Sequence, residues 1–410
     1  MSHPTRRRFL QAASSLTAIA PLIAPRRQPR QGAASKRILA YVGTYSNPQG
    51  AAPGRGQGIH ILELDPATGA LTPHDVVRTT GSPSWLAFDR TRTHLYSANE
   101  TDVSGTGSGS VAAYSVDRTS GRLTLLNSVS SGGAGPAHLS VHPAGKHVLV
   151  ANYGGGTSAV LPIQADGRLG DATDVKRHEG TPGPTQASSA PPGSFAISGH
   201  EKPHAHMIEA DPAGRFVLTA DLALDRILVW RFDGSTGTLT PNDPPSAAVP
   251  PGDGPRHFVF HSNGRWFYSL QEEGSTIVAF DYDAANGRLR EKQTISTLPK
   301  GFAGTNFTSE IVVSPDSRFV YAANRLHDSI VWFAIGADGR LTWGGEEWTR
   351  GDYPRSFTIY PAGRFLFSCN QRSDAIAGFR IDAKSGRLTF TGQYTAVGSP
   401  AHIAFLAEAG

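Results

Sequence analysis

The sequence predicts an all-β fold in which seven four-stranded antiparallel blades form a ring, a β-propeller. One sequence repeat ending in Gly-x-Leu occurs seven times from residue 38 onward. Its glycines are Gly69, Gly121, Gly167, Gly237, Gly287, Gly339 and Gly386. Successive glycines are 52, 46, 70, 50, 52 and 47 residues apart, and a period of about 45 to 50 residues is typical of propeller blades. The 46 Gly, 29 Pro and 9% aromatic residues also fit many short strands joined by tight turns.

A complete blade is clearest near the C-terminus. There we expect four strands, at residues 355–360, 365–369, 375–381 and 387–394. Val, Ile, Phe and Tyr supply the strands, while Pro361 and Gly386 mark two of the turns. The repeat therefore predicts one four-stranded meander per blade.

The last blade needs strands from the other end of the chain. A strand beginning near Ser399 is followed by too few residues to complete a blade. Three extended segments, residues 38–44, 58–64 and 71–77, precede the first complete blade. We expect N- and C-terminal strands to share one blade, which closes the ring and removes its open edge. Residues 38–410 should then form one domain.

The first 37 residues differ in character from the repeats. Thr5-Arg6-Arg7-Arg8-Phe9-Leu10 precedes an apolar segment at 12–24, the pattern of a twin-arginine export signal. That segment is too short and too rich in Ser and Thr for a membrane span. We predict that residues 1–37 are a signal peptide and linker, that the twin-arginine translocase is a partner during export, and that the protein is periplasmic or secreted without stable membrane association. The alternative is a basic tail on a cytosolic enzyme.

The charge of the chain argues against a nucleic-acid partner. The formal charge is +4, but residues 1–37 hold eight basic residues and no acid, so the rest has 30 Lys and Arg against 34 Asp and Glu. No basic surface is then expected for phosphate backbones or anionic membranes. The single cysteine, Cys369, excludes an intrachain disulfide framework, and its apolar neighbours predict a small buried strand residue.

The repeat also locates a candidate site. In a propeller the first strand of each blade lines the central channel, and the rim where it begins is where the second strand ends. The turn between the first two strands of a blade has a reference residue at Arg90, Pro143, Pro212, Ser262, Pro315 and Pro361. The residues six positions before it are Ser84, Ala137, His206, Arg256, Ser309 and Arg355, and Ala401 is the equivalent residue of the last strand. Counting ten residues after the reference residue gives Glu100, Tyr153, Leu222, Glu272, Arg325 and Gln371. The residues at these rim positions differ from blade to blade and several are charged, although the surrounding repeat is constant. Such variation is expected of a functional site built on a repeated fold.

Four of these residues come from three consecutive blades: His206, Arg256, Glu272 and Arg325. Guanidinium groups bind carboxylate or phosphate and stabilise an oxyanion, while Glu272 or His206 could activate water. The alternative is a structural salt bridge between Arg256 and Glu272, which is compatible with catalysis. The amide or acid side chain that ends each second strand, such as Asn152 and Asn324, is interpreted first as a turn and bridging residue.

Other chemistries have little support in the sequence. His204 and His206 could share one face of a strand, with His178 nearby, but no acidic ligand set accompanies them, so we expect neither a metal nor another cofactor. Motifs of serine hydrolases, zinc proteases and nucleotide-binding loops are missing from the sequence. One long insertion, about residues 177–203, explains the 70-residue gap and is expected to cover the channel mouth.

The chain resembles the seven-bladed lactonase family, the propeller type of 6-phosphogluconolactonase, and its relative, the carboxy-muconate cycloisomerase. The resemblance rests on Tyr41-Val-Gly-Thr-Tyr45, His142-Pro-Ala-Gly, Val150-Ala-Asn-Tyr-Gly-Gly155, Pro203-His-Ala-His206, Gly254-Pro-Arg-His257, Glu310, Ser314-Pro-Asp316 and Asn324-Arg325. It implies catalytic roles for His206, Arg256, Glu272 and Arg325. We place substrate binding on His204, His257, Asn152, Asn324, Arg355 and Glu310. Leu326, Gln271 and Ser262 depart from the family pattern.

The resemblance implies ring-opening hydrolysis of a sugar lactone, with a small-molecule lactone or sugar acid as the partner. Because phosphorylated pentose-pathway lactones are cytosolic, an exported member is expected to act on an unphosphorylated sugar lactone or another acidic lactone. Two alternatives stay open: a muconate-type lactonising cycloisomerase that uses the same four residues, and a non-catalytic propeller that binds carbohydrate or protein.

Overall fold

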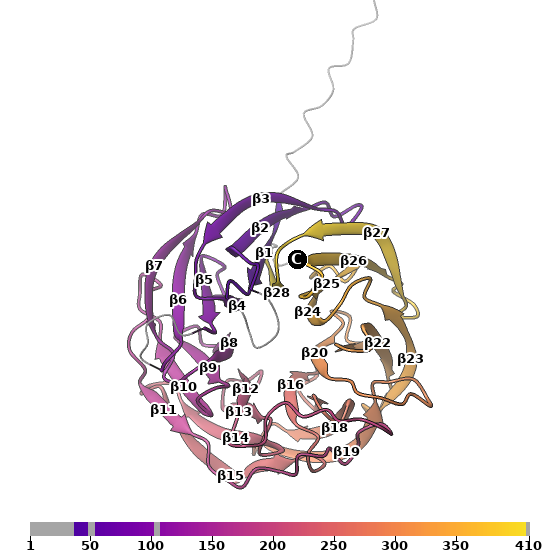
Figure 1. Ribbon diagram of the computed structural model, residues 1–410. Helices are drawn as coiled ribbons and strands as arrows, with labels where there is room; N and C mark the ends of the chain where they lie inside the picture. Colours follow the sequence, from indigo (N-terminus) through magenta and orange to yellow (C-terminus); the bar gives the residue numbers. More distant parts are fainter. Residues whose placement is uncertain (1–36, 48–53, 102–106, 407–410) are drawn as a thin grey trace, which may run out of the picture. The chain divides into compact units, whose positions relative to one another are not determined.

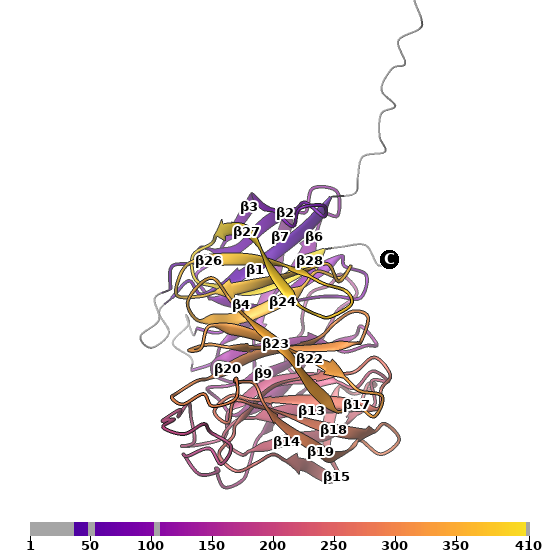
Figure 2. The same ribbon diagram turned by 90° about the vertical axis from the view of Figure 1, so that its right-hand side faces the viewer.

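The computed structural model describes residues 37–47, 54–101 and 107–406. The predicted export signal therefore lies outside the described residues. Within them, 28 strands form seven four-stranded antiparallel sheets around a central channel (Figure 1). Figure 2 views this ring from its edge, where outer strands such as β23 and β27 run obliquely across its wall. The described part of the chain contains no helix suited to crossing a bilayer. The predicted all-β propeller is confirmed.

The strands alternate with short turns along the whole described chain. In order they are β1 (Ile38–Thr44), β2 (Gly58–Leu64), β3 (Leu71–Arg78), β4 (Pro83–Phe88), β5 (His94–Asn99), β6 (Ser110–Val116), β7 (Leu123–Ser130), β8 (Pro136–Val141), β9 (His147–Asn152), β10 (Thr157–Pro162), β11 (Asp174–Arg177), β12 (Ala205–Ala210), β13 (Phe216–Asp221), β14 (Arg226–Asp233), β15 (Thr238–Ala248), β16 (Pro255–Phe260), β17 (Trp266–Gln271), β18 (Thr276–Asp283), β19 (Arg288–Ser296), β20 (Thr308–Val313), β21 (Phe319–Asn324), β22 (Ser329–Ile335), β23 (Leu341–Trp348), β24 (Pro354–Ile359), β25 (Phe365–Asn370), β26 (Ala375–Ile381), β27 (Leu388–Ala396) and β28 (Pro400–Leu406).

The two ends of the described chain meet in one blade. Its strand order is β28-β1-β2-β3, and β28 pairs with β1 through partners such as Leu39 and Leu406. The predicted closure is therefore confirmed, and Figure 1 shows β1 and β28 side by side. Expected strand ends differ from the observed ones by a residue or two. For example, β24 begins at Pro354 instead of residue 355, because a proline is tolerated at the first position of a strand.

Neighbouring blades pack through large apolar side chains on both sheet faces. Phe258 and Phe267 of one blade lie with ring centroids 4.9 Å apart, inside a buried cluster that also contains Leu218 of the preceding blade. Cys369 is fully buried in β25, as predicted. Burying such aromatic side chains on both faces of each sheet is the main source of stability between blades.

The recurring glycine has a structural cause. Gly339 and Gly386 have φ values of 82° and 73°, a region that disfavours other residues. A Cβ on Gly339 would lie 2.5 Å from the Trp266 ring of the preceding blade. Its carbonyl oxygen accepts a hydrogen bond from Tyr268 OH at 2.9 Å. The glycine therefore lets each turn approach the neighbouring blade closely enough to bond to it.

A β-bulge lies at the rim end of the channel-lining strand in every blade. In each blade one residue of the first strand has no residue directly opposite it on the paired strand. These residues are Ser84, Ala137, His206, Arg256, Arg355 and Ala401, and in β20 one of Ser309 and Glu310. A bulge bends the strand and re-aims side chains. The rim positions identified from the repeat thus coincide with the bulges.

Candidate active site

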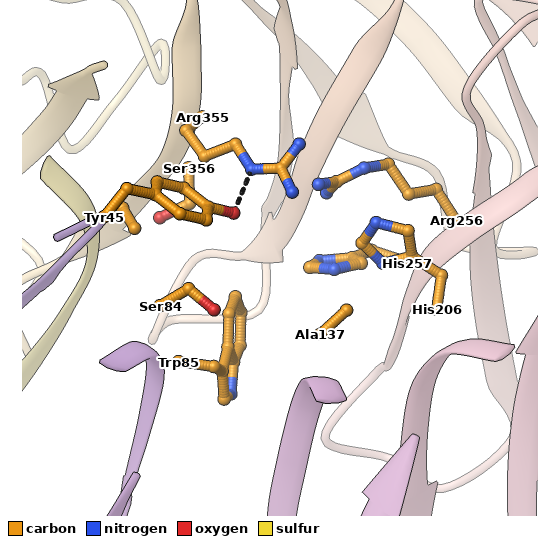
Figure 3. A pocket seen from close by; sticks show the side chains of 10 residues that line it. Tyr45, Ser84, Trp85, Ala137, His206, Arg256, His257, Arg355 and Ser356 are labelled. Atoms are coloured by element: carbon orange, nitrogen blue, oxygen red, sulfur yellow. Dashed lines mark hydrogen bonds between the residues drawn. The ribbon is translucent and has the colours of Figure 1, made fainter. Parts of the chain in front are cut away.

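A small cavity lies at the rim of the channel, where the first strands of the blades begin (Figure 3). It is lined by Tyr45, Ser84, Trp85, Ala137, His206, Arg256, His257, Arg355, Ser356 and Ala401. Its volume is about 10 Å³, room for about one water molecule. The structure therefore brings together six of the seven bulged rim positions. At the remaining position, the carbonyl oxygen of Ser309 accepts a hydrogen bond from Arg256 Nη1.

Glu272 is held between two arginines beside this cavity. Its Oε2 lies 2.7 Å from Arg256 Nε, and its Oε1 lies 2.8 Å from Arg325 Nη2. All three side chains are buried. Burial by itself raises the pKa of Glu272, but Arg325 and Arg256 outweigh burial and hold the pKa at about 2. Glu272 is therefore an ionised anchor for both guanidiniums and a very weak base.

Arg355 supplies a third guanidinium from the next blade. Its Nε donates to Tyr45 OH at 2.8 Å, and that hydroxyl donates to Glu100 Oε2 at 2.9 Å. In Figure 3 the guanidinium groups of Arg355 and Arg256 point toward one another. Burial and the charge of Arg355 lower the pKa of Arg256 to about 10, so Arg256 stays protonated at neutral pH. Two facing cations create strong attraction for an anion at this point.

Two histidines complete the wall of the cavity. The ring centroids of His206 and His257 are 5.1 Å apart. Burial and the nearby Arg256 charge lower the pKa of each imidazole well below its usual value. Both are therefore neutral at pH 7 and can accept a proton. His257 Nδ1 lies 3.0 Å from Glu310 Oε1, so Glu310 contacts the cavity wall through His257.

Three predicted binding residues lie away from the cavity. Asn152 and Asn324 are fully buried, and their amide nitrogens donate to the carbonyl oxygens of Ser131 and Thr297, both at 2.9 Å. Each of these bonds joins the end of a second strand to the segment that follows the outer strand of the preceding blade, which is a bridging role. His204 stacks on Tyr153, with ring centroids 4.3 Å apart.

The histidines considered as metal ligands have other partners. His178 Nδ1 contacts Asp221 Oδ2 at 2.6 Å, whereas His204 Nδ1 contacts the carbonyl oxygen of Tyr153 at 2.9 Å. In the described ranges, no group of three or more His, Cys, Asp and Glu side chains is arranged to hold a metal ion.

Sequence reasoning missed three lining residues: Tyr45, Trp85 and Ser356. Trp85 and Ser356 directly follow the bulged residues Ser84 and Arg355. Successive side chains of a regular strand point to opposite faces, so counting positions selected only one residue per blade. The bulge places both neighbours at the cavity. Tyr45 belongs to one of the phrases that carry the family resemblance.

The long insertion lies against the same rim. Ser198 N donates to Glu273 Oε1, and Ser198 O accepts from Tyr153 OH at 3.2 Å. Further along, Phe195 N donates to Thr305 Oγ1 at 3.1 Å. The insertion thus contacts the segments that follow β9 and β17 and the segment that precedes β20, and 78% of the Phe195 surface is exposed.

Comparison with known proteins shows the family of the chain. The family model described as "Lactonase, 7-bladed beta-propeller" matches residues 39–405. The 6-phosphogluconolactonase of Bacillus subtilis (strain 168) is 34% identical over 371 residues, which cover 90% of this chain and 99% of that protein. The 6-phosphogluconolactonase of Pectobacterium carotovorum (strain PC1) is 30% identical over 352 residues, covering 86% and 96%.

Among solved structures, the periplasmic gluconolactonase of Pseudomonas aeruginosa is similar. Its TM-score is 0.79 at 33% identity, and the match covers 90% of this chain and 99% of that one. The fold and the relatives agree. The chain therefore belongs to the seven-bladed β-propeller lactonase family and is a lactone hydrolase.

Proposed function

We propose that the protein hydrolyses a sugar lactone of the gluconolactone type at the cavity beside Arg256 and Arg355. The convergence of guanidiniums and neutral imidazoles on a cavity of water size carries this proposal. Hydrolysis needs a water molecule, a proton acceptor and cations for the oxyanion. The cavity has room for the water, its imidazoles can accept the proton, and its arginines supply the cations.

The small cavity volume constrains how a substrate would bind. A space of about 10 Å³ holds a water molecule but no sugar ring. The lactone ring must therefore lie at the channel mouth, with its carbonyl group facing the cavity. In that position Arg256 and Arg355 stabilise the negative charge that develops on the carbonyl oxygen, and Arg325 maintains the position of Glu272.

Glu272 and His206 are the two bases that the sequence suggests. Both oxygens of Glu272 are already paired with arginines, whereas His206 and His257 each have a ring nitrogen without a hydrogen-bond partner among the described residues. The geometry therefore favours an imidazole as the base and gives Glu272 the role of holding the arginines. His206 and His257 both line the cavity and both qualify by position.

The proposed compartment is the periplasm, and the proposed substrate is an unphosphorylated lactone. The twin-arginine motif and the apolar segment that follows it support export. The similar P. aeruginosa protein is described as a periplasmic gluconolactonase, whereas the B. subtilis relative is named for the 6-phosphate. Both lactones are therefore the substrates to compare.

The test is a substrate panel on protein that begins at residue 37. Hydrolysis of glucono-δ-lactone, its 6-phosphate and a simple alkyl lactone is followed by proton release, after subtraction of spontaneous opening. We expect kcat/KM to be highest for glucono-δ-lactone. A clear preference for the 6-phosphate contradicts the substrate assignment, and failure to open any sugar lactone contradicts the proposed function. Arg256→Lys should lose most of the activity, while the exposed Arg340→Lys serves as the control.

A further inference from the structure

The pair formed by His257 and Glu310 spans two adjacent blades. His257 follows the bulged Arg256 in β16, and Glu310 is one of the two residues at the bulge of β20. His257 Nδ1 and Glu310 Oε1 are 3.0 Å apart, and both side chains are buried. His257 also lines the cavity, whereas Glu310 lies behind it. This is the order of atoms found where a carboxylate orients a histidine base.

The hydrogen bond to Glu310 determines which nitrogen of His257 is free. When Nδ1–H donates to the carboxylate, Nε2 carries the lone pair. Nε2 is buried and has no hydrogen-bond partner among the described residues. A buried acceptor without a partner is costly unless a water or a substrate occupies it. The cavity beside the ring has room for about one water.

His206 lacks a comparable carboxylate. Its Nδ1 is buried and has no hydrogen-bond partner among the described residues. The charges that affect its pKa most strongly, after burial, come from Arg256, His257, Arg355 and Arg325, and each of them opposes protonation. A proton taken up by His206 would add positive charge beside these arginines. The same three arginines also lower the pKa of His257. His257 differs in that its Nδ1 is bonded to Glu310, whose carboxylate stabilises the imidazolium that forms when Nε2 takes up a proton.

We propose that His257 is the general base of lactone hydrolysis and that Glu310 is the positioning residue that fixes its tautomer. This inference rests on the proposed lactone hydrolysis. A water molecule in the cavity attacks the lactone carbonyl carbon and transfers one proton to His257 Nε2. The carbonyl π electrons move to the oxygen, which faces Arg256 and Arg355. When the intermediate collapses, the bond to the ring oxygen breaks and that oxygen takes the proton from His257. One water is added and a hydroxy acid is released.

The proposal requires a pH dependence from Glu310. Only the ionised carboxylate can accept the Nδ1 proton and stabilise the imidazolium. Burial raises the pKa of Glu310 to about 7, against smaller lowering effects of His402 and Arg256. The titratable groups that face it from neighbouring strands are His257 and Arg256 of β16, His402 of β28, Glu209 of β12 and Cys369 of β25. Activity should therefore rise as pH increases through about 7.

Glu209 provides a matched control for Glu310. Its pKa is also raised to about 7, first by burial and then by the charge of Glu310. Both carboxyls line the same pocket of the central channel, on the far side of Trp85. However, only Glu310 bonds to His257. A rise in activity that depends on general channel charge will be lost in both variants, whereas the proposed dyad will lose the rise only when Glu310 is substituted and will show it at lower pH when Glu209 is substituted, because the two carboxylates repel each other.

The experiment measures the pH profiles of kcat and KM with glucono-δ-lactone for wild type, His257→Gln, Glu310→Gln and Glu209→Gln. We expect His257→Gln to lower kcat by about 10²- to 10⁴-fold, the usual contribution of a general base. Glu310→Gln should lower kcat by about 10-fold or more, with little change in KM, and should abolish the rise near pH 7. Glu209→Gln should keep the maximal rate and the rise, with the rise shifted to lower pH because a repelling carboxylate has been removed.

Several outcomes would overturn the assignment. They are wild-type rates and an intact pH rise in Glu310→Gln or His257→Gln, or loss of the rise in Glu209→Gln. Nitrogen NMR of wild-type protein adds a readout that does not depend on how the variants fold, since His257 should be the Nδ1–H tautomer above pH 8. An Nε2–H tautomer contradicts the proposal. A wild-type enzyme that opens no lactone instead contradicts the proposed function itself.

Discussion

Glu272 Oε1 lies 2.8 Å from Arg325 Nη2 across the boundary between two blades, while its other oxygen contacts Arg256 of its own blade. One buried carboxylate therefore holds two cations that come from β16 and from the end of β21. Neutralising it leaves two buried guanidiniums without their counter-ion, which is far costlier than losing a surface pair.

We expect Glu272→Gln to lower kcat/KM by about 10²-fold or more, because the arginines then lose their fixed positions. Its free energy of unfolding should fall by about 3 to 5 kcal/mol, the usual cost of breaking a buried ion pair. Steady-state kinetics and urea unfolding measure the two effects. The control is Glu63→Gln, whose carboxylate forms an exposed pair with Arg37. Wild-type activity in Glu272→Gln would remove Glu272 from the site.

The same carboxylate predicts a dependence of stability on pH. Its pKa is about 2 in the folded protein, below the value of about 4.3 in an unfolded chain. The stabilisation by Glu272 is therefore fully present above pH 4.3 and is lost as pH falls toward 2. The stability difference between wild type and Glu272→Gln should shrink over this range. Denaturant unfolding at several pH values measures it, and a constant difference contradicts the low pKa.

Arg325 is expected to need its planar guanidinium. It lies over the rings of Phe307 and Tyr353, at 5.3 and 5.2 Å from their centroids, and contacts Glu272 at the same time. A lysine keeps the positive charge, but it can neither stack on the two rings nor present the planar set of N–H donors of a guanidinium. We expect Arg325→Lys to reduce kcat/KM by about 10- to 10³-fold. Arg318→Lys, at an exposed position over Phe319, is the control in the same assay.

Gly339 should tolerate no side chain. Its φ of 82° and the 2.5 Å approach of a Cβ to the Trp266 ring both oppose alanine. We expect Gly339→Ala to destabilise the protein by about 1 to 3 kcal/mol, with a correspondingly lower Tm. The control is Gly264→Ala, which has a similar φ but open space around it. Equal losses in the two variants would show that only backbone strain matters.

Export should depend on the arginine pair near the N-terminus. We expect the double substitution Arg6→Lys and Arg7→Lys to keep the protein in the cytoplasm, because the twin-arginine route reads that pair. Fractionation of a bacterial host followed by lactonase assay locates the protein. Changing Arg26 and Arg27 to lysine should leave export intact. Periplasmic activity in the first variant argues for another route.

The repeat in the sequence was sufficient to predict the ring, its closure and the rim position in each blade. Arg256 and Arg355 were found because the blades share one frame, so a charged residue at a fixed position stood out. Trp85 and Ser356 were missed because a β-bulge has no signature in a single sequence. The ionisation of Glu272 also could not be predicted, since it depends on burial and on which arginines converge there.

The pairing of β28 with β1 makes the two ends of the described propeller neighbours in one sheet. The order in which the blades follow one another around the circle is therefore independent of where the polypeptide starts. A circularly permuted chain, with residues 406 and 38 joined by a short linker and new ends in the turn after Trp348, would keep every strand pair. Such a permutant would hold the same arginines and histidines around the channel.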